Sequence, residues 1–218
     1  MNSEKLRSPD AGRKMQLYWS SRSPFVRKVM ICAHECGVAD LLHLKRVEVG
    51  SRKLDVELMR HCPINRIPTL ILENGEPLYD SAVICSYLDH SFNQGRLSLP
   101  MGDRNYWMER RLEALGDGMM DFTTGRVAEK SREFPSDVRL EICARKLASA
   151  MDWLDEHAPN LNPSGLTIGQ IAVASALCHL DFRDAGLNWR QGRDALKTWH
   201  RNICERDSVQ KTAFEDTY

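Results

Sequence analysis

The chain has 218 residues, of which 42% are hydrophobic and 28% are charged, a composition typical of a soluble globular protein of one or two domains. Thirty basic residues balance thirty acidic ones, so nothing in the charge indicates nucleic acid or a membrane as a partner. No apolar run approaches the roughly 20 residues that span a bilayer. Residues 1–14 lack the apolar segment of a secretory signal, and we expect them to be a disordered leader or a cloning remnant.

The seven cysteines are scattered and include no CxxC pair. Free cysteine behaves as a small hydrophobe, and a chain that uses it so fits a reducing cytoplasm. Cys32-x-His34-x-Cys36 and Cys178-His179 contain residue types that bind metals, but neither has a second ligand pair at a useful distance. We therefore predict a cytoplasmic protein with no metal site.

A strand followed at once by a helix is predicted near the N-terminus. Residues 15–19 alternate between apolar and polar positions, and from Phe25 to Ala33 the apolar residues recur at helical spacing. Ser23-Pro24 suits the N-cap and first turn of that helix, and Gly37 suits its C-terminal end. The hydroxyls of Ser21 and Ser23 then lie at the positive end of a helix, which attracts anions and lowers the pKa of thiols. Taken alone, the same residues are also an ordinary helix cap.

The next residues complete a compact α/β unit. The predicted elements are a strand at 42–49, a short helix at 54–59, a strand at 69–72, a return strand at 77–79 and a helix that begins at Asp80-Ser81. Asn74-Gly75 indicates a type I′ hairpin between the last two strands. In the final helix we expect Val83, Ile84, Tyr87 and Leu88 to face inward. This order predicts one parallel crossover and a terminal hairpin within residues 15–91.

Residues 92–102 lack a period and read as a linker, and residues 103–218 contain helical patterns only. Apolar stripes at 108–122 and 140–154 predict two helices that pack antiparallel. Thr167 and Gln170 can form a capping box, in which each satisfies a backbone donor of the other. The helix that this box opens is apolar nearly all round and belongs in the centre of the helical domain. A last helix is expected near 193–205.

Four separated segments together resemble a known family. They are SSRSPFVRKV, Asn65-Arg66-Ile67-Pro68-Thr69, Asp80-Ser81 and the box at 167–170. In this order and spacing they resemble cytosolic glutathione S-transferases over roughly residues 15–203, and the first is similar to bacterial serine-type members and to the zeta, theta and omega classes. The family's box usually ends in Asp, where this chain has Gln170. The resemblance implies a thioredoxin-like N-terminal domain that binds glutathione, an all-helical C-terminal domain, and a homodimer.

The resemblance also implies a set of glutathione contacts. Ile67-Pro68 matches the family's cis-proline, where the backbone of Ile67 would pair with the cysteinyl part of glutathione. Ser81 would bind the γ-glutamyl carboxylate and Asp80 its ammonium, although Asp80 is also a good N-cap. Lys53 would meet the glycyl carboxylate, or it is simply a charge on the surface.

Either serine could activate the glutathione thiol. Ser23 aligns with the serine of the theta class and the cysteine of the omega class, whereas Ser21 aligns with the first serine of the zeta motif. A hydroxyl that donates to the sulfur favours the thiolate over the thiol. We favour Ser23, with Ser21 as the alternate, and name Met119, Phe122 and Arg126 as candidates for a second-substrate pocket between the domains.

The resemblance therefore predicts a glutathione transferase of detoxification type that attacks small hydrophobic electrophiles with glutathione as co-substrate. A glutathione-dependent isomerase or disulfide reductase is an alternative on the same fold, although the absence of cysteine at positions 21 and 23 argues against a mixed-disulfide mechanism. A non-catalytic binding or regulatory protein is a third possibility, because a fold does not fix a function.

Overall fold

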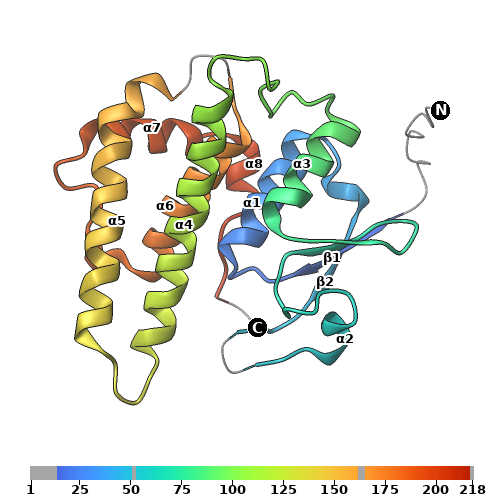
Figure 1. The fold of residues 1–218 in the computed structure, drawn as a ribbon, viewed down its shortest axis with the longest axis horizontal. Coiled ribbons are helices and arrows are strands. Elements are labelled where there is room, and N and C mark those ends of the chain that lie inside the picture. Colours follow the sequence, from blue (N-terminus) through green and yellow to red (C-terminus); the bar gives the residue numbers. More distant parts are fainter. Residues whose placement is uncertain (1–13, 51–52, 162–164, 217–218) are drawn as a thin grey trace.

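A computed structural model describes residues 14–50, 53–161 and 165–216. In these residues an α/β unit with a four-stranded sheet is followed by a unit of helices only (Figure 1). The predicted thioredoxin-like domain and the all-helical domain are both present. Apart from its last residue, the predicted leader at 1–14 lies outside the described residues. Among the described helices, none combines the length and the apolar character that crossing a membrane requires.

The sheet has the strand order β2-β1-β3-β4. Its strands are β1 (Met15–Trp19), β2 (Leu42–Arg46), β3 (Thr69–Ile71) and β4 (Pro77–Leu78). β1 runs parallel to β2 and antiparallel to β3, and β4 runs antiparallel to β3. β1, β2 and β4 therefore all end at the same edge of the sheet, and β3 begins there. Every loop at this edge comes from a segment in which the sequence predicts a glutathione contact.

The helices of the α/β unit are α1 (Pro24–Glu35), α2 (Val56–Met59) and α3 (Ser81–Phe92). Ser23 is the N-cap of α1, as predicted, since its Oγ accepts a hydrogen bond of 3.3 Å from Val26 N. Beyond the C-terminal end of α1, Gly37 takes a φ of 70°, the left-handed conformation that a glycine there provides. The boundaries of this helix were thus readable from capping residues alone.

The hairpin between β3 and β4 differs from the prediction. Gly75 N donates to Leu72 O, and Leu72 N donates to Glu76 O, each over 2.9 Å, so the loop has three residues. Only Gly75 in this loop takes a positive φ, of 86°, whereas a type I′ turn needs a positive φ at Asn74 as well. In α3 the prediction for Val83 is also wrong, because 46% of this residue is exposed.

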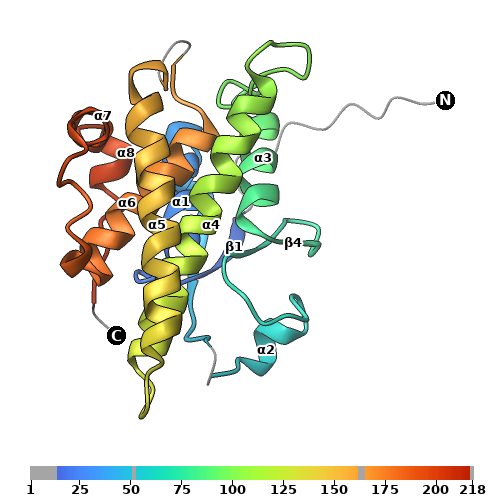
Figure 2. The same cartoon turned by 60° about the vertical axis from the view of Figure 1, so that its left-hand side comes forward.

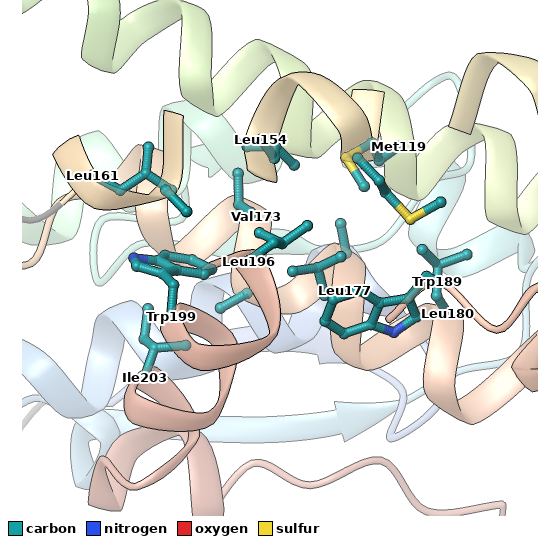
Figure 3. Packing of buried hydrophobic residues seen from close by; sticks show 14 of the residues in the cluster. Met119, Leu154, Leu161, Val173, Leu177, Leu180, Trp189, Leu196, Trp199 and Ile203 are labelled. Carbon is teal, nitrogen blue, oxygen red and sulfur yellow. The ribbon is translucent and has the colours of Figure 1, made fainter. Parts of the chain in front are cut away.

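The helical unit is built around one buried helix. Its elements are α4 (Tyr106–Lys130), α5 (Asp137–His157), α6 (Ile168–Arg183), α7 (Asp194–Cys204) and α8 (Asp207–Gln210). α4 and α5 run antiparallel beside each other, as predicted (Figures 1 and 2). α6 is buried along most of its length, and Figure 3 shows its Val173 and Leu177 in one apolar cluster with Leu154, Leu196 and Trp199.

α4 and α6 cross so closely that only glycine fits at the contact. A Cβ on Gly116 would lie 2.6 Å from the carbonyl carbon of Ala172, and one on Gly169 would lie 2.7 Å from Glu109 O. Glu109 Oε1 also accepts a 3.0 Å hydrogen bond from Gly169 N, so a side chain of α4 caps the start of α6. The two units are tied together where α1 packs on α4 and α6.

Half of the predicted capping box at the start of α6 is present. Thr167 Oγ1 accepts from Gln170 N over 3.4 Å, but the side chain of Gln170 does not return the bond. Its Nε2 donates instead to Leu161 O and to Gly165 O, the latter over 3.1 Å. Gln170 thereby anchors the loop before α6, a role that an amide donor can fill and a carboxylate cannot.

Candidate active site

The sheet register brings the predicted glutathione residues to one edge. Tyr18 pairs with Thr69, so Pro68 lies next to the end of β1, where the loop with Ser21 and Ser23 starts. Leu78 pairs with Leu70, so β4 delivers its following residues, Asp80 and Ser81, to the same edge. The site is therefore assembled by strand pairing between segments that lie far apart in the sequence.

Ser23 stands at the N-terminus of α1 and is half-buried. Its Oγ accepts from Val26 N, and among the described residues its hydroxyl has no acceptor. The proton of this hydroxyl therefore remains available to an anion. The dipole of α1 adds a positive potential at the same point.

Ser21 is differently engaged. It is buried, its hydroxyl donates to Glu215 O over 3.0 Å, and it accepts from Arg46 Nη2 over 3.0 Å. Glu215 N donates back to Ser21 O over 3.4 Å, and Arg22 forms an ion pair of 2.6 Å with Asp216. The segment 211–216 is thus fixed on the loop that carries both serines. Because the proton of Ser21 is already used, the structure separates the two serines chemically.

A hollow of about 170 Å³ opens beside both serines. It is bounded on one side by the segment 211–215, and on the other by apolar side chains from β1, α1 and β2: Trp19, Val26, Met30 and Leu44. Arg27 also borders it, with its guanidinium 4.6 Å from the ring centroid of Phe214 and a hydrogen bond of 3.1 Å to Val209 O. The hollow combines an apolar wall with three charged residues, Arg27, Lys211 and Glu215.

The loop before β3 and the start of α3 have the features that the sequence predicts. The Ile67–Pro68 peptide bond is cis, and so is the Tyr79–Asp80 bond, which the sequence did not suggest. Asp80 is exposed and caps α3, because its Oδ1 accepts from Ala82 N over 3.1 Å. Ser81 is buried, with an exposed fraction of 2%. The sequence allowed two roles for Asp80, a helix cap and a contact to the glutathione ammonium. The structure confirms the helix cap.

Lys53 lies at the surface, in the connection between β2 and α2. Its side chain is 63% exposed and forms an ion pair with Glu48, and its backbone bridges to Gly50. An exposed ion pair of this kind is weak and easily exchanged. The pair with Glu48 therefore does not by itself fix the position of the ammonium.

A buried cation lies between the two units, and the sequence analysis missed it. Lys28 of α1 is fully buried, and its Nζ lies 2.9 Å from Glu113 Oε1 and 2.8 Å from Asp117 Oδ1, both on α4. One ammonium thus faces two carboxylates. Burial raises the pKa of Asp117, Lys28 lowers it only in part, and the charges of Glu113 and Asp80 raise it further. Arg110 also forms an ion pair with Glu113, so two cations and two carboxylates meet at this junction.

The three second-substrate candidates lie in two different places. Met119 and Phe122 line a groove of about 430 Å³ between α4 and α5, together with Lys146 and Trp153. All of its lining residues come from these two helices, so it is not the pocket between the domains that we expected. Arg126 lines neither hollow, because its guanidinium is buried and its Nε donates to Asp184 over 2.6 Å. This buried partner, at the C-cap of α6, fixes the arginine as part of the core.

The fold and the arrangement of loops at the sheet edge define a class of protein. The N-terminal domain model of the glutathione S-transferases matches residues 22–91, and the C-terminal domain model matches residues 106–202. The chain belongs to the glutathione S-transferase family.

Individual relatives agree with this assignment. The chain is 33% identical to a glutathione transferase family member from Pseudomonas fluorescens Pf-5, solved with bound glutathione, with a TM-score of 0.88 over 93% of this chain and 100% of that one. A glutathione S-transferase from Methylobacillus flagellatus KT, with glutathione bound, is 31% identical with a TM-score of 0.79 over 92% and 99%. The uncharacterized GST-like protein YibF of Escherichia coli K12 is 28% identical over 91% of this chain and 98% of its own length.

Sequence reasoning found the loops of the site but not the residues that hold them. Arg46 and Glu215, which contact Ser21, belong to segments with no motif. The sequence did contain a signal for the burial of Lys28. This lysine lies on the apolar face of α1, three residues after Phe25, one before Val29 and four before Cys32. A lysine in such a position needs a buried acidic partner.

Proposed function

We propose that the protein is a glutathione transferase of the serine type, which activates the thiol of glutathione for attack on small hydrophobic electrophiles. The observation that carries this proposal is the hydroxyl of Ser23. It stands at the N-terminus of α1 with its oxygen used as a cap and its proton available. The bound glutathione reported for the two structural relatives supports the same ligand here.

In this mechanism Ser23 donates a hydrogen bond to the glutathione sulfur and α1 contributes the positive potential of its first turn. Both interactions favour the thiolate over the thiol. A free thiol has a pKa of about 8.5, and lowering it by about two units makes the thiolate the main form at neutral pH. The thiolate then attacks the electrophilic carbon, a carbon–sulfur bond forms, and the leaving group departs with the bonding electrons.

We propose that the sheet edge holds the rest of glutathione. The backbone of Ile67, before cis-Pro68, pairs with the cysteinyl part, and Ser81 with the first turn of α3 binds the γ-glutamyl carboxylate. Asp80 attracts the ammonium, and Lys53 leaves its surface pair for the glycyl carboxylate. These roles place glutathione binding in a domain of residues 15–91, followed by a linker at 92–102 and a helical domain at 103–218.

For the electrophile we propose the hollow beside Ser23 as the entry, because its walls of Trp19, Met30 and Leu44 are apolar and its size suits a small molecule. The groove at Met119 and Phe122 would serve only for a part of the electrophile that extends beyond this hollow. Arg126 has no place in this proposal.

The experiment that tests the activation step is an ultraviolet titration of the thiolate in the glutathione complex. We expect the bound thiol to titrate well below its free value in the native protein and in Ser21→Ala, and close to the free value in Ser23→Ala. Ser21→Ala is the matched control, because it removes a neighbouring hydroxyl whose proton is bound to Glu215 O.

Two other results would contradict the proposal in different ways. If glutathione binds with an unshifted thiol in all three proteins, the serines act only as caps and the chain does not activate the thiol. If glutathione does not bind at millimolar concentration, the chain is a binding or regulatory protein with this fold.

We further propose a homodimer. Several large apolar residues near the start of α4 and on α3 are exposed, among them Trp107 at 72%, Met101 at 74% and Val83 at 46%. We propose that these side chains form one surface, which would be costly in water and would suit a partner. Sedimentation should give twice the mass of one chain, and Trp107→Glu should give a monomer, whereas Phe134→Glu, at an exposed residue between α4 and α5, should leave the dimer intact.

We place the protein in the cytoplasm and its function in detoxification. Support for the location comes from the cysteines, all seven of which are free thiols. Support for the role is the apolar lining of the hollow, which fits small hydrophobic electrophiles rather than one polar metabolite.

A further inference from the structure

Two cysteines and a histidine meet where α6 packs on α7. His200 and Cys204 are separated by one helical turn on α7, and Cys178 faces them from α6. Cys178 Sγ lies 3.8 Å from Cys204 Sγ and 3.4 Å from His200 Nε2, and Cys204 Sγ lies 3.5 Å from the same nitrogen. The helices that carry them are held by the apolar cluster of Figure 3, in which Leu196 of α7 packs with Leu177 of α6.

These distances match one face of a tetrahedral zinc site. Zinc binds sulfur at about 2.3 Å and imidazole nitrogen at about 2.0 Å, so ligands at the tetrahedral angle lie about 3.8 Å apart for two sulfurs and about 3.5 Å apart for sulfur and nitrogen. All three distances between the ligand atoms of Cys178, His200 and Cys204 agree with these values to about 0.1 Å. The ligand atoms would therefore need little rearrangement to hold the ion.

We propose that Cys178, His200 and Cys204 form a zinc site, with two thiolates and one imidazole as ligands and a fourth position left to water. This replaces our prediction from the sequence that the chain has no metal site. None of the three residues lines the hollow beside Ser23, so this site does not depend on the proposed transferase function.

Charge and burial favour this ion. His200 is buried and both cysteines are half-buried, so an isolated charge would be costly there. Two thiolates neutralise a divalent cation, and the complex then adds no net charge to the interior. Soft sulfur ligands with one imidazole select zinc over the hard cations magnesium and calcium, which prefer oxygen.

The surroundings orient the histidine. The ring of Trp189 meets the ring of His200 edge to face, with 5.1 Å between centroids, and Nε2 faces both sulfurs. Metal binding at Nε2 requires the ring proton on Nδ1, which lies 3.5 Å from Arg190 Nη2. Arg190 donates its shorter hydrogen bonds, of 2.5 and 2.7 Å, to Asp181, so giving up the long contact to the ring costs little.

The first test is a cobalt titration of the full chain, purified under reducing conditions and freed of metal with a chelator. We expect one cobalt per chain, a thiolate-to-metal charge-transfer absorption, and displacement by zinc. Cys178→Ser and Cys204→Ser should each weaken cobalt binding by more than about a hundredfold. Losing a residue that only hydrogen-bonds to a metal ligand already lowers metal affinity by about 10- to 100-fold, and a ligand itself should matter more. Cys143→Ser, at a half-buried cysteine of α5 outside the cluster, should bind as the native chain does.

A second measurement does not depend on variants that fold. X-ray absorption of the zinc-loaded native chain should show two sulfur neighbours and one or more nitrogen or oxygen neighbours. A shell of nitrogen and oxygen only, cobalt binding that survives both cysteine substitutions, or no binding by the reduced native chain would each overturn the proposal. Isolation of a Cys178–Cys204 disulfide from reducing conditions would overturn it too, in favour of a redox pair. Circular dichroism of each variant, measured in parallel, shows whether it is folded.

Discussion

Single residues decide the chemistry at the start of α1. Ser21 and Ser23 are the same amino acid two positions apart, yet one hydroxyl proton is bound by a backbone carbonyl and the other is available. The sequence places both at the start of the helix but cannot distinguish them, because the acceptor for Ser21 lies 194 residues further along the chain. Tertiary contacts, rather than motif position, determine which hydroxyl proton is already bound.

Lys28 is the residue at which we expect a substitution to cost most. Lys28→Met should destabilise the fold by about 3 to 5 kcal/mol, because it leaves Asp117 without its cation and Glu113 with Arg110 alone. Urea unfolding would measure this loss.

Two comparisons separate charge from packing at this position. Adding Glu113→Gln and Asp117→Asn to Lys28→Met should recover most of the stability, since no buried charge is then left unpaired. Arg145→Met, which breaks an exposed pair with Glu141, should cost less than about 1 kcal/mol. A small effect of Lys28→Met by itself would show that the carboxylates are neutral or hydrated.

At the scale of elements, the crossing of α4 and α6 depends on glycine. Gly116→Ala should destabilise the protein by about 1 to 3 kcal/mol or more, because its Cβ would meet backbone atoms of Ala172 and Val173 at 2.6 and 2.7 Å, and backbone cannot rotate away. Thermal or urea unfolding checks this value.

Gly125→Ala is the matched control on the same helix. Nothing lies within 4 Å of its Cβ, so alanine should stabilise α4 by up to about 1 kcal/mol through its higher helix propensity. Equal effects of the two substitutions would mean that the helices can move apart and that the close crossing is not required.

Local signals predicted the elements well, and contacts between elements poorly. The cap at Ser23 and the end at Gly37 follow from residues next to one another, whereas the cis bond before Pro68 was expected from the family resemblance, and all three are present. The meeting of Cys178 with His200 and Cys204 depends on where α6 crosses α7, which no periodicity specifies. The inward prediction for Val83 failed for a related reason, since an apolar side chain does not reveal which helix face lacks a neighbour within the chain.

At the scale of the whole molecule, residues 211–216 connect the helical unit to the serine loop. Phe214 stacks on Phe182, with 5.0 Å between ring centroids, and lies under Arg27, while its neighbours Glu215 and Asp216 contact Ser21 and Arg22. Removing this ring should loosen the loop without unfolding either unit.

We therefore expect Phe214→Ala to increase hydrogen exchange in peptides that contain residues 20–23 and to leave peptides of α4 unchanged, as measured by mass spectrometry. Phe134→Ala, at a residue that is 80% exposed, should change neither. Unchanged exchange at the serine loop in Phe214→Ala would show that the loop is held by its own turn and by Arg46.

The attachment of residues 211–216 to the serine loop also bears on how the protein is made. A ribosome releases the strands and loops of the glutathione edge more than a hundred residues before it releases Phe214 and Glu215. The N-terminal domain can fold in that interval, since domains generally fold as units during synthesis. Its serine loop nevertheless reaches its final hydrogen bonds only when the helical domain has followed and docked. Until residues 211–216 are in place, the N-terminal domain can be folded while its serine loop still lacks the contact that fixes Ser21.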